Sequence, residues 1–176
     1  MLKIITLLFA ATVNIGCSAS YKYVASNVVG GHLTTSTGVL ISTPEDARFE
    51  NATYNNSGAM TANAVQSAFA RHADRVDTVS DCHGINCLDD IDLVEFGYYV
   101  KPEILHWEDR ATEWSGKSDR LEIHLTVYDT STRQKLASGS YSGKSKWATM
   151  GGDHPQDLLA KPTDHFVSML YGGSDD

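Results

Sequence analysis

The segment Arg120–Tyr128 alternates apolar and polar side chains, and this pattern constrains the fold more than any other feature of the chain. Four aliphatic residues occupy every second position: Leu121, Ile123, Leu125 and Val127. The positions between them hold Arg120, Glu122, His124, Thr126 and Tyr128. Because successive side chains of a strand point to opposite faces, the pattern predicts a β-strand with one buried and one polar face. A sheet built on this strand needs a second layer over its apolar face.

Further strand-like segments predict the rest of that sheet. Phe96–Arg110 is rich in aromatic and β-branched residues, and Pro102 within it marks an edge or a bulge. Lys135–Trp147 has the Ser and Gly content of a solvent-facing strand. The connections among these three segments are short, which favours antiparallel neighbours. A short apolar run at 39–41 predicts one more buried strand.

Two segments have helical periodicity, and they complete the predicted layers. Within 57–73 the apolar residues recur at spacings of three and four: Met60, Ala64, Val65, Ala68 and Phe69. The second helical segment is 155–171, which Pro162 is expected to break. The element order predicts an α+β fold, with helices packed on a mostly antiparallel, mixed sheet. We expect a single domain over 38–171, preceded by a tether over 17–37 with a short early strand around Tyr23-Val24, and followed by a frayed tail over 172–176.

Residues 1–16 predict a signal peptide. Lys3 is its one charged residue, and the apolar run Ile4–Val13 reaches about 15 Å as a helix, half of the apolar core of a bilayer. The run ends in Asn14-Ile15-Gly16-Cys17, which resembles a bacterial lipobox with Asn14 where Leu is usual. The resemblance implies that Cys17 receives a lipid and becomes the mature N-terminus.

The same resemblance implies sorting to the outer membrane, because Ser18 rather than Asp follows the cysteine. The domain would then lie in the periplasm and contact the membrane through its N-terminal lipid. The alternative is an ordinary secretory signal cleaved after Ala19, which would release a soluble periplasmic or cell-surface protein.

Lipidation of Cys17 would leave Cys82 and Cys87 as an even pair in an exported protein, which predicts a disulfide that staples a local turn. The alternative is a metal site formed by Cys82, His83 and Cys87 with one of the nearby aspartates. Adjacent Cys82 and His83 cannot easily bind one ion, and zinc sites usually have a second ligand pair elsewhere. We interpret the acidic stretch 89–92 as a solvated surface, and we expect neither a metal nor a cofactor.

Residues 104–116 read Ile-Leu-His-Trp-Glu-Asp-Arg-Ala-Thr-Glu-Trp-Ser-Gly. This string resembles the signature of an uncharacterised family of Gram-negative lipoproteins, labelled domain of unknown function 4823. The resemblance extends to 54–58, to 155–159 and to the closing Leu170-Tyr171. It implies export, lipidation and an α/β domain similar to small periplasmic lipoprotein modules. The family supplies no catalytic residues that could be transferred to this chain.

This segment contains the candidate binding surface: His106, Trp107, Glu108, Asp109, Arg110, Glu113 and Trp114. The first interpretation is structural, with Arg110 bridging Glu122 or a neighbouring carboxylate while the tryptophans cover the sheet. The second is an exposed interface, since Trp and Arg dominate interaction hot spots. The third is catalysis, with Glu108 or Asp109 as acid or base. Its partners would be His106 and, across the hairpin, His124. We rank the three in this order, because no phosphate loop or nucleophile-elbow motif supports catalysis.

The net charge of −8 disfavours nucleic-acid binding, which depends on attraction to phosphates. Together with the lipobox resemblance and the ranking of the motif interpretations, this leads to our main hypothesis. It is a non-enzymatic outer-membrane lipoprotein whose domain binds an envelope partner, either a protein or a glycan. The alternative is a small hydrolase or ligand-binding domain that uses the segment His106–Glu113.

Overall fold

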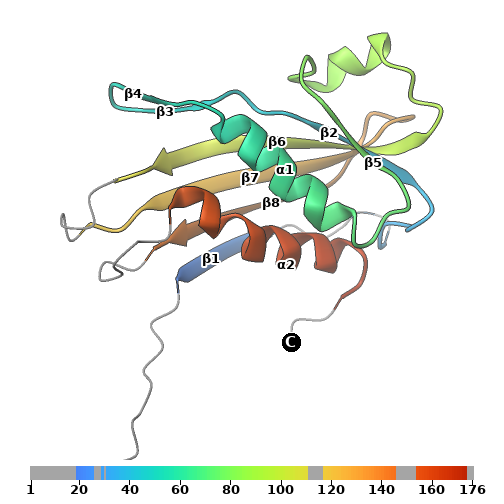
Figure 1. Ribbon diagram of the computed structural model, residues 1–176. Helices are drawn as coiled ribbons and strands as arrows, with labels where there is room; N and C mark the ends of the chain where they lie inside the picture. The colour runs from blue at the N-terminus through green and yellow to red at the C-terminus, as the bar shows by residue number, and fades with distance from the viewer. Residues whose placement is uncertain (1–18, 26–28, 30, 111–116, 146–153, 174–176) are drawn as a thin grey trace, which may run out of the picture.

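A computed structural model describes residues 19–25, 29, 31–110, 117–145 and 154–173 (Figure 1). The predicted lipidation site Cys17 and the motif residues Glu113 and Trp114 lie outside these residues. The elements occur in the order β1 (Ser20–Ala25), β2 (Gly38–Ser42), β3 (Ala47–Phe49), β4 (Ala52–Tyr54), α1 (Ser57–Phe69), β5 (Val76–Val79), the 3₁₀ helix η1 (Ile85–Asp90), β6 (Phe96–Glu108), β7 (Arg120–Asp129), β8 (Lys135–Lys144), the 3₁₀ helix η2 (Pro155–Leu158) and α2 (Ala160–Leu170). No helix within the described ranges is long and apolar enough to cross a membrane.

Six strands form one mixed sheet in the order β1-β8-β7-β6-β2-β5, and β3 and β4 form a separate hairpin. Neighbours from β1 to β6 are antiparallel, whereas β2 runs parallel to both β6 and β5. The α+β class and the mostly antiparallel, mixed sheet are thus confirmed. Pro102 lies beyond the end of the β2–β6 ladder, so its missing N–H removes no hydrogen bond between β2 and β6.

Both helices lie over one face of the sheet (Figure 1). The main core between these layers contains Phe69 of α1, Phe166 of α2 and Trp107 of β6. It also contains the four aliphatic residues that the sequence pattern selected, each at most 1% exposed: Leu121, Ile123, Leu125 and Val127. The alternation of β7 therefore predicted correctly which face of the sheet is buried.

The contacts at the start of α1 explain why the run 54–58 contains Asn56 and Gly58. Both oxygens of Asp46 accept hydrogen bonds from the first turn, one from Asn56 N–H at 3.0 Å and one from Gly58 N–H at 2.9 Å. Asn56 adopts a left-handed conformation with φ 67°, which asparagine tolerates better than most residues. A Cβ atom at Gly58 would lie 2.1 Å from the carbonyl oxygen of Pro44, so glycine is required at this close approach.

The structure differs from the sequence-based expectations at three places. Within the predicted tether, β1 pairs with β8, and Leu33 joins the main core, so the fold includes residues before 38. The stretch 43–56, for which no strand or helix was predicted, contains the β3–β4 hairpin. The C-terminal helical segment divides at Leu159 rather than at Pro162, because proline is tolerated in the first turn of α2, where no intrahelical N–H bond is needed.

The other face of the sheet is divided into a covered and an open part. At the β5–β2 end, the segment 80–95 covers a smaller hydrophobic cluster formed by Leu40, Cys82, Leu88, Phe96 and Tyr99. Leu40 faces this cluster while Val39 and Ile41 face the main core, as expected from the alternation of strand side chains. Toward the opposite end of the sheet, this face carries polar side chains such as Glu122, His124 and Ser140.

Candidate functional site

The end of β6 places Trp107 inside the protein. A register shift between Ile104 and His106 lets both Ile104 and Trp107 face the main core, while Leu105 is 55% exposed. Trp107 itself is 3% exposed. The prediction that this tryptophan belongs to a binding surface is therefore wrong, and its place in the core agrees with the structural interpretation of the motif.

Glu108 lies beside Trp107 and is buried on the polar face of the strand. It accepts a hydrogen bond of 2.5 Å from Nε of Arg110 and forms a second contact with Nη2 of the same guanidinium. Nε2 of His106 lies 3.4 Å from its other oxygen. Burial alone would raise the pKa of Glu108, but the hydrogen bonds and positive charges of Arg110 and His106 outweigh it and hold that pKa below its usual value.

These contacts decide among the three interpretations of the motif. The structural interpretation expected Arg110 to bridge a carboxylate, and the partner is Glu108 rather than Glu122. An ionised carboxylate clamped by a guanidinium is a poor proton donor near neutral pH. His124 is bonded elsewhere, to Ser140 Oγ at 2.8 Å and Thr126 Oγ1 at 3.2 Å. The geometry of the described residues therefore favours a structural role over acid–base catalysis.

Asp109 belongs to a separate polar cluster with Asp119 and His154, whose potential ligand atoms lie within 4.8 Å of one another. Oδ1 of Asp109 lies 3.5 Å from Nδ1 of His154, and Oδ1 of Asp119 accepts a hydrogen bond of 2.6 Å from the backbone N–H of Arg110. Burial and the nearby charge of Asp109 raise the pKa of Asp119. This group could hold a cation or share a proton. No local spacing predicted it, because three separate segments of the chain contribute its members.

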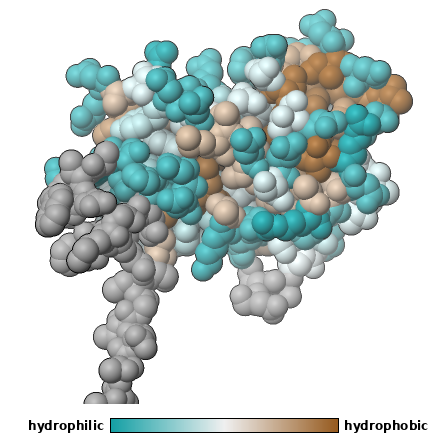
Figure 2. Space-filling view, in the orientation of Figure 1, coloured by the Kyte–Doolittle hydropathy of each residue, from teal (hydrophilic) through white to brown (hydrophobic). Residues whose placement is uncertain are grey.

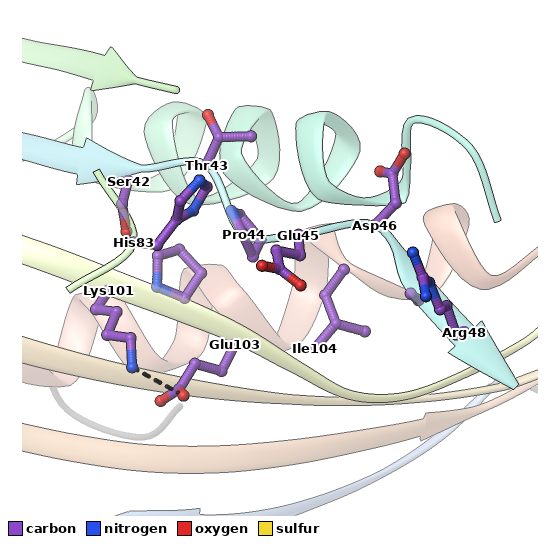
Figure 3. A pocket seen from close by; sticks show the side chains of 12 residues that line it. Ser42, Thr43, Pro44, Glu45, Asp46, Arg48, His83, Lys101, Glu103 and Ile104 are labelled. Atoms are coloured by element: carbon purple, nitrogen blue, oxygen red, sulfur yellow. Dashed lines mark hydrogen bonds and ion pairs between the residues drawn. The ribbon is translucent and has the colours of Figure 1, made fainter. Parts of the chain in front are cut away.

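A cleft of about 460 Å³ lies between the stretch 42–48 and β6 (Figure 3). Pro102 and Ile104 line it from β6, and the side chain of His83 reaches it from the segment 80–95. Its charged groups are of both signs, and Lys101 forms an ion pair of 2.9 Å with Glu103. The cleft can admit a small polar group, but it offers no concentration of one charge.

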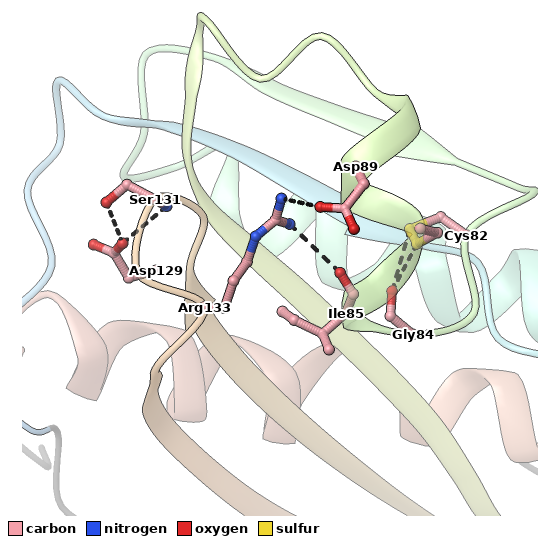
Figure 4. A network of polar contacts seen from close by, with 8 residues as sticks. Cys82, Gly84, Ile85, Asp89, Asp129, Ser131 and Arg133 are labelled. Carbon is pink, nitrogen blue, oxygen red and sulfur yellow. Dashed lines mark hydrogen bonds and ion pairs between the residues drawn. A yellow bond between two sulfur atoms is a disulfide. The ribbon is translucent and has the colours of Figure 1, made fainter.

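The segment 80–95 is fixed to the rest of the fold in two ways. Cys82 and Cys87 form the predicted disulfide, with their Cα atoms 5.3 Å apart. Arg133, in the turn between β7 and β8, donates to Asp89 Oδ1 at 2.9 Å and to the carbonyl oxygen of Ile85 at 3.4 Å (Figure 4). Asp129 orders this turn by accepting hydrogen bonds from Ser131 and Thr132, and these bonds lower the pKa of Asp129. The segment is therefore held in a defined conformation.

The outer surface of this segment carries one exposed aliphatic side chain among its polar residues. Val94 is 90% exposed. Four half-buried neighbours pack on the smaller cluster beside it: Ile85, Cys87, Ile91 and Leu93. We call these five residues the disulfide patch, and Figure 2 shows hydrophobic surface gathered over this end of the molecule. Five acidic residues and no lysine or arginine accompany them within 80–95: Asp81, Asp89, Asp90, Asp92 and Glu95.

The disulfide patch was not predicted from the sequence, although a weak signal for it is present. Leu93 and Val94 form an apolar pair inside an acidic stretch, where no strand or helix pattern would bury both. The N–H of Val94 donates to Oδ1 of Asp92 at 3.1 Å, and this local turn presents Val94 to solvent.

Comparisons with known proteins agree with this architecture. The family model described as domain of unknown function (DUF4823) matches residues 31–170, which confirms the resemblance found in the motif. No curated protein matches the chain. The structure of the PelC dodecamer from Paraburkholderia phytofirmans aligns with a TM-score of 0.66 and 9% identity, over 89% of this chain and 100% of that one. Protein XCC0632 from Xanthomonas campestris, of the family DUF330, aligns with a TM-score of 0.52 and 15% identity, over 77% and 84% respectively. At these identities the likeness concerns the fold alone.

Proposed function

The chain belongs to the DUF4823 family, and from this premise we propose that it is a non-enzymatic, lipid-anchored envelope protein that binds a protein partner through the disulfide patch. The observation that carries the proposal is the exposure of Val94 at 90% among half-buried aliphatic side chains. Single exposed hydrophobic residues are common on monomeric proteins. A contiguous patch rimmed by charge is typical of interaction sites.

The chemistry of the patch favours a protein over a glycan. Four of its five side chains are aliphatic, and they suit burial against apolar side chains of a partner. The acidic residues around it favour a partner with basic residues at the rim, which would speed encounter and select the partner. The disulfide and the contacts of Arg133 hold the patch in place before binding, so little conformational entropy is lost on association.

The position of the patch is consistent with anchoring at Cys17. Ser20, three residues after the predicted lipidation site, lies in one row of the sheet with Lys144, Arg120 and Glu108. β6 runs from Phe96, beneath the disulfide segment, to Glu108 in that row, about 40 Å for an extended strand of this length. A lipid on Cys17 would therefore leave the patch directed away from the membrane.

The first partner to test is a second copy of the chain, because the PelC relative of the same fold is a dodecamer. Sedimentation velocity of the purified mature protein measures self-association directly. Loss of an oligomer on Val94→Asp would identify the partner as the chain itself, whereas a monomer would direct the search to other envelope proteins.

The decisive experiment is photo-crosslinking in the native envelope, with a photoreactive residue at Asn86, an exposed position on the same segment. We expect a discrete protein adduct that Val94→Asp abolishes without lowering the melting temperature. Leu105→Asp is the matched control, because Leu105 is also an exposed aliphatic residue but lies near the other end of β6. An adduct that persists in Val94→Asp, or one that disappears equally in Leu105→Asp, would refute the proposal.

A further inference from the structure

Three basic side chains meet in a hollow of about 510 Å³ at the end of the sheet where β1 begins. Lys22 of β1, Arg120 of β7 and Lys144 of β8 line it and are all exposed. Ser20 and Glu122 also line it. One carboxylate against three cations leaves this basic hollow with a local positive charge, although the whole chain carries −8.

The strand register makes this charge arrangement unfavourable for the isolated protein. Lys144 lies directly opposite Arg120 on β7, and like charges at directly opposed positions destabilise a sheet. Glu108 lies opposite Arg120 on the other side, but it is bound to Arg110. Among the described residues, none of the three basic side chains of the hollow forms an ion pair. An external anion would relieve their mutual repulsion.

The position of the hollow indicates which anion is within reach. Ser20 lines the hollow and lies three positions after Cys17, a span of about 10 Å at most. Acyl chains on Cys17 would hold the hollow at the level of the phospholipid headgroups. This distance is close to the Debye length of about 8 Å at physiological ionic strength, so surface charge is felt there.

We propose that the basic hollow docks onto the phosphates of anionic phospholipids in the membrane that holds the Cys17 lipid. The inference rests on the lipid anchoring of the proposed function. The lipid alone would leave the domain free to tilt and rotate on its short linker. Three cations bound to headgroups would instead fix the β1 end of the sheet against the membrane and direct the disulfide patch toward the aqueous side.

The test is amine-reactive footprinting of the acylated full mature protein in vesicles. One set of vesicles is pure phosphatidylcholine, and the other contains one third phosphatidylglycerol. We expect the modification rates of Lys22 and Lys144 to fall several-fold in the anionic vesicles and to recover in high salt. Lys135 is the internal control, because it is an exposed lysine at the opposite end of the same strand β8, and its rate should not change.

A substitution sharpens this measurement. Each basic side chain near an anionic surface contributes a factor of about five in affinity. Arg120→Gln should therefore reduce the protection of both lysines by about that factor. Arg48→Gln, which removes an exposed arginine outside the hollow, should leave their protection unchanged.

Several outcomes would overturn the inference. Equal modification rates in both vesicles would exclude headgroup docking. Protection of Lys22 and Lys144 in phosphatidylcholine vesicles by 10 mM inorganic phosphate, or by a soluble polyuronate, would assign the hollow to a free anion or a glycan instead. If the protein carries no acyl chain and does not sediment with vesicles, the proposed anchoring fails. Docking is then measured separately, with the Cys17 thiol coupled to a maleimide lipid.

Discussion

The apolar residues at the two ends of β6 differ in how completely they are buried. At the Glu108 end, Trp107 enters the main core, and the charged residues beside it are paired with one another. At the Phe96 end, the covering segment 80–95 buries a smaller cluster and leaves Val94 exposed. The comparison teaches that a concentration of Trp, Arg and carboxylates can serve folding, and the binding surface that we propose lies where burial is incomplete.

The difference has a physical cause in the amount of covering structure. Two helices lie over the face that receives Trp107. The segment 80–95 supplies one 3₁₀ helix and short turns, which cannot enclose every aliphatic side chain that they carry. The disulfide and Arg133 supply the rigidity that a larger core would otherwise provide.

The largest effect that tests this comparison is on stability at the Glu108 end. Trp107→Ala should lower the free energy of unfolding by about 3–5 kcal/mol, because it removes a large side chain from a packed core. Urea unfolding followed by circular dichroism measures the change. Leu105→Ala, two positions away and exposed, should cost less than about 1 kcal/mol. A Trp107→Ala protein as stable as the wild type would show that this end does not depend on its core.

The ion pair at the same end should have the next largest effect. Arg110→Ala leaves the buried carboxylate of Glu108 without its main partner, and we expect a loss of about 2–3 kcal/mol. The double variant Arg110→Ala/Glu108→Leu should regain part of this loss, because it removes the uncompensated charge. Comparable stability of Arg110→Ala and wild type in the same urea titration would contradict the structural role of the pair.

Reduction of the disulfide tests the other end. The ring closed by Cys82 and Cys87 is short, so reduction should cost about 2 kcal/mol at most. The change should be local. Hydrogen exchange should accelerate within 80–95 and remain slow in β7, which contacts the main core. Uniform acceleration over the whole sheet would show that the two ends are not independent.

The smallest expected effect is on how stability changes with pH. Arg110 and His106 lower the pKa of Glu108 in the folded protein. Its contribution to the free energy of unfolding is therefore present above the usual glutamate pKa of 4.5 and is lost as the pH falls through the lower folded value. The contribution of Asp119 to the free energy of unfolding changes with pH in the opposite direction. Its pKa is raised, so its contribution is present below the usual 3.8 and is lost as the pH rises through the higher folded value.

Glu108→Gln should therefore unfold in urea with a shallower loss of stability than the wild type below about pH 4.5. Asp119→Asn should show a steeper loss in the same range. Urea midpoints near pH 6 and pH 3 measure both changes. Parallel curves for all three proteins would mean that neither carboxylate has a perturbed pKa.

Much of the fold could be predicted from local patterns. The alternation in β7 and the helical spacing in α1 each report directly on burial, because a single element repeats the signal over several residues. The β3–β4 hairpin lacked such a signal, since its strands are three residues long and half of their residues are exposed. β1 gave a weaker signal, a short strand expected around Tyr23-Val24, because its residues are polar or small apart from its tyrosines and Val24.

The candidate site was harder to predict, because exposure depends on tertiary contacts. The sequence shows that Trp107 is aromatic, but the register shift before it determines which face of β6 it occupies. The exposure of Val94 depends on how segment 80–95 lies on Tyr99 and Leu40. Neither fact can be derived from spacing along the chain.

The most direct test of the account compares partner crosslinking from Asn86 in two folded variants, Val94→Asp and Glu108→Gln. Both are assayed below their melting temperatures, so that stability does not enter the result. We predict that Val94→Asp abolishes the adduct and that Glu108→Gln retains it, because Glu108 serves the fold alone. Loss of the adduct in folded Glu108→Gln, with full retention in Val94→Asp, would contradict the account and place the function at the Glu108 end of β6.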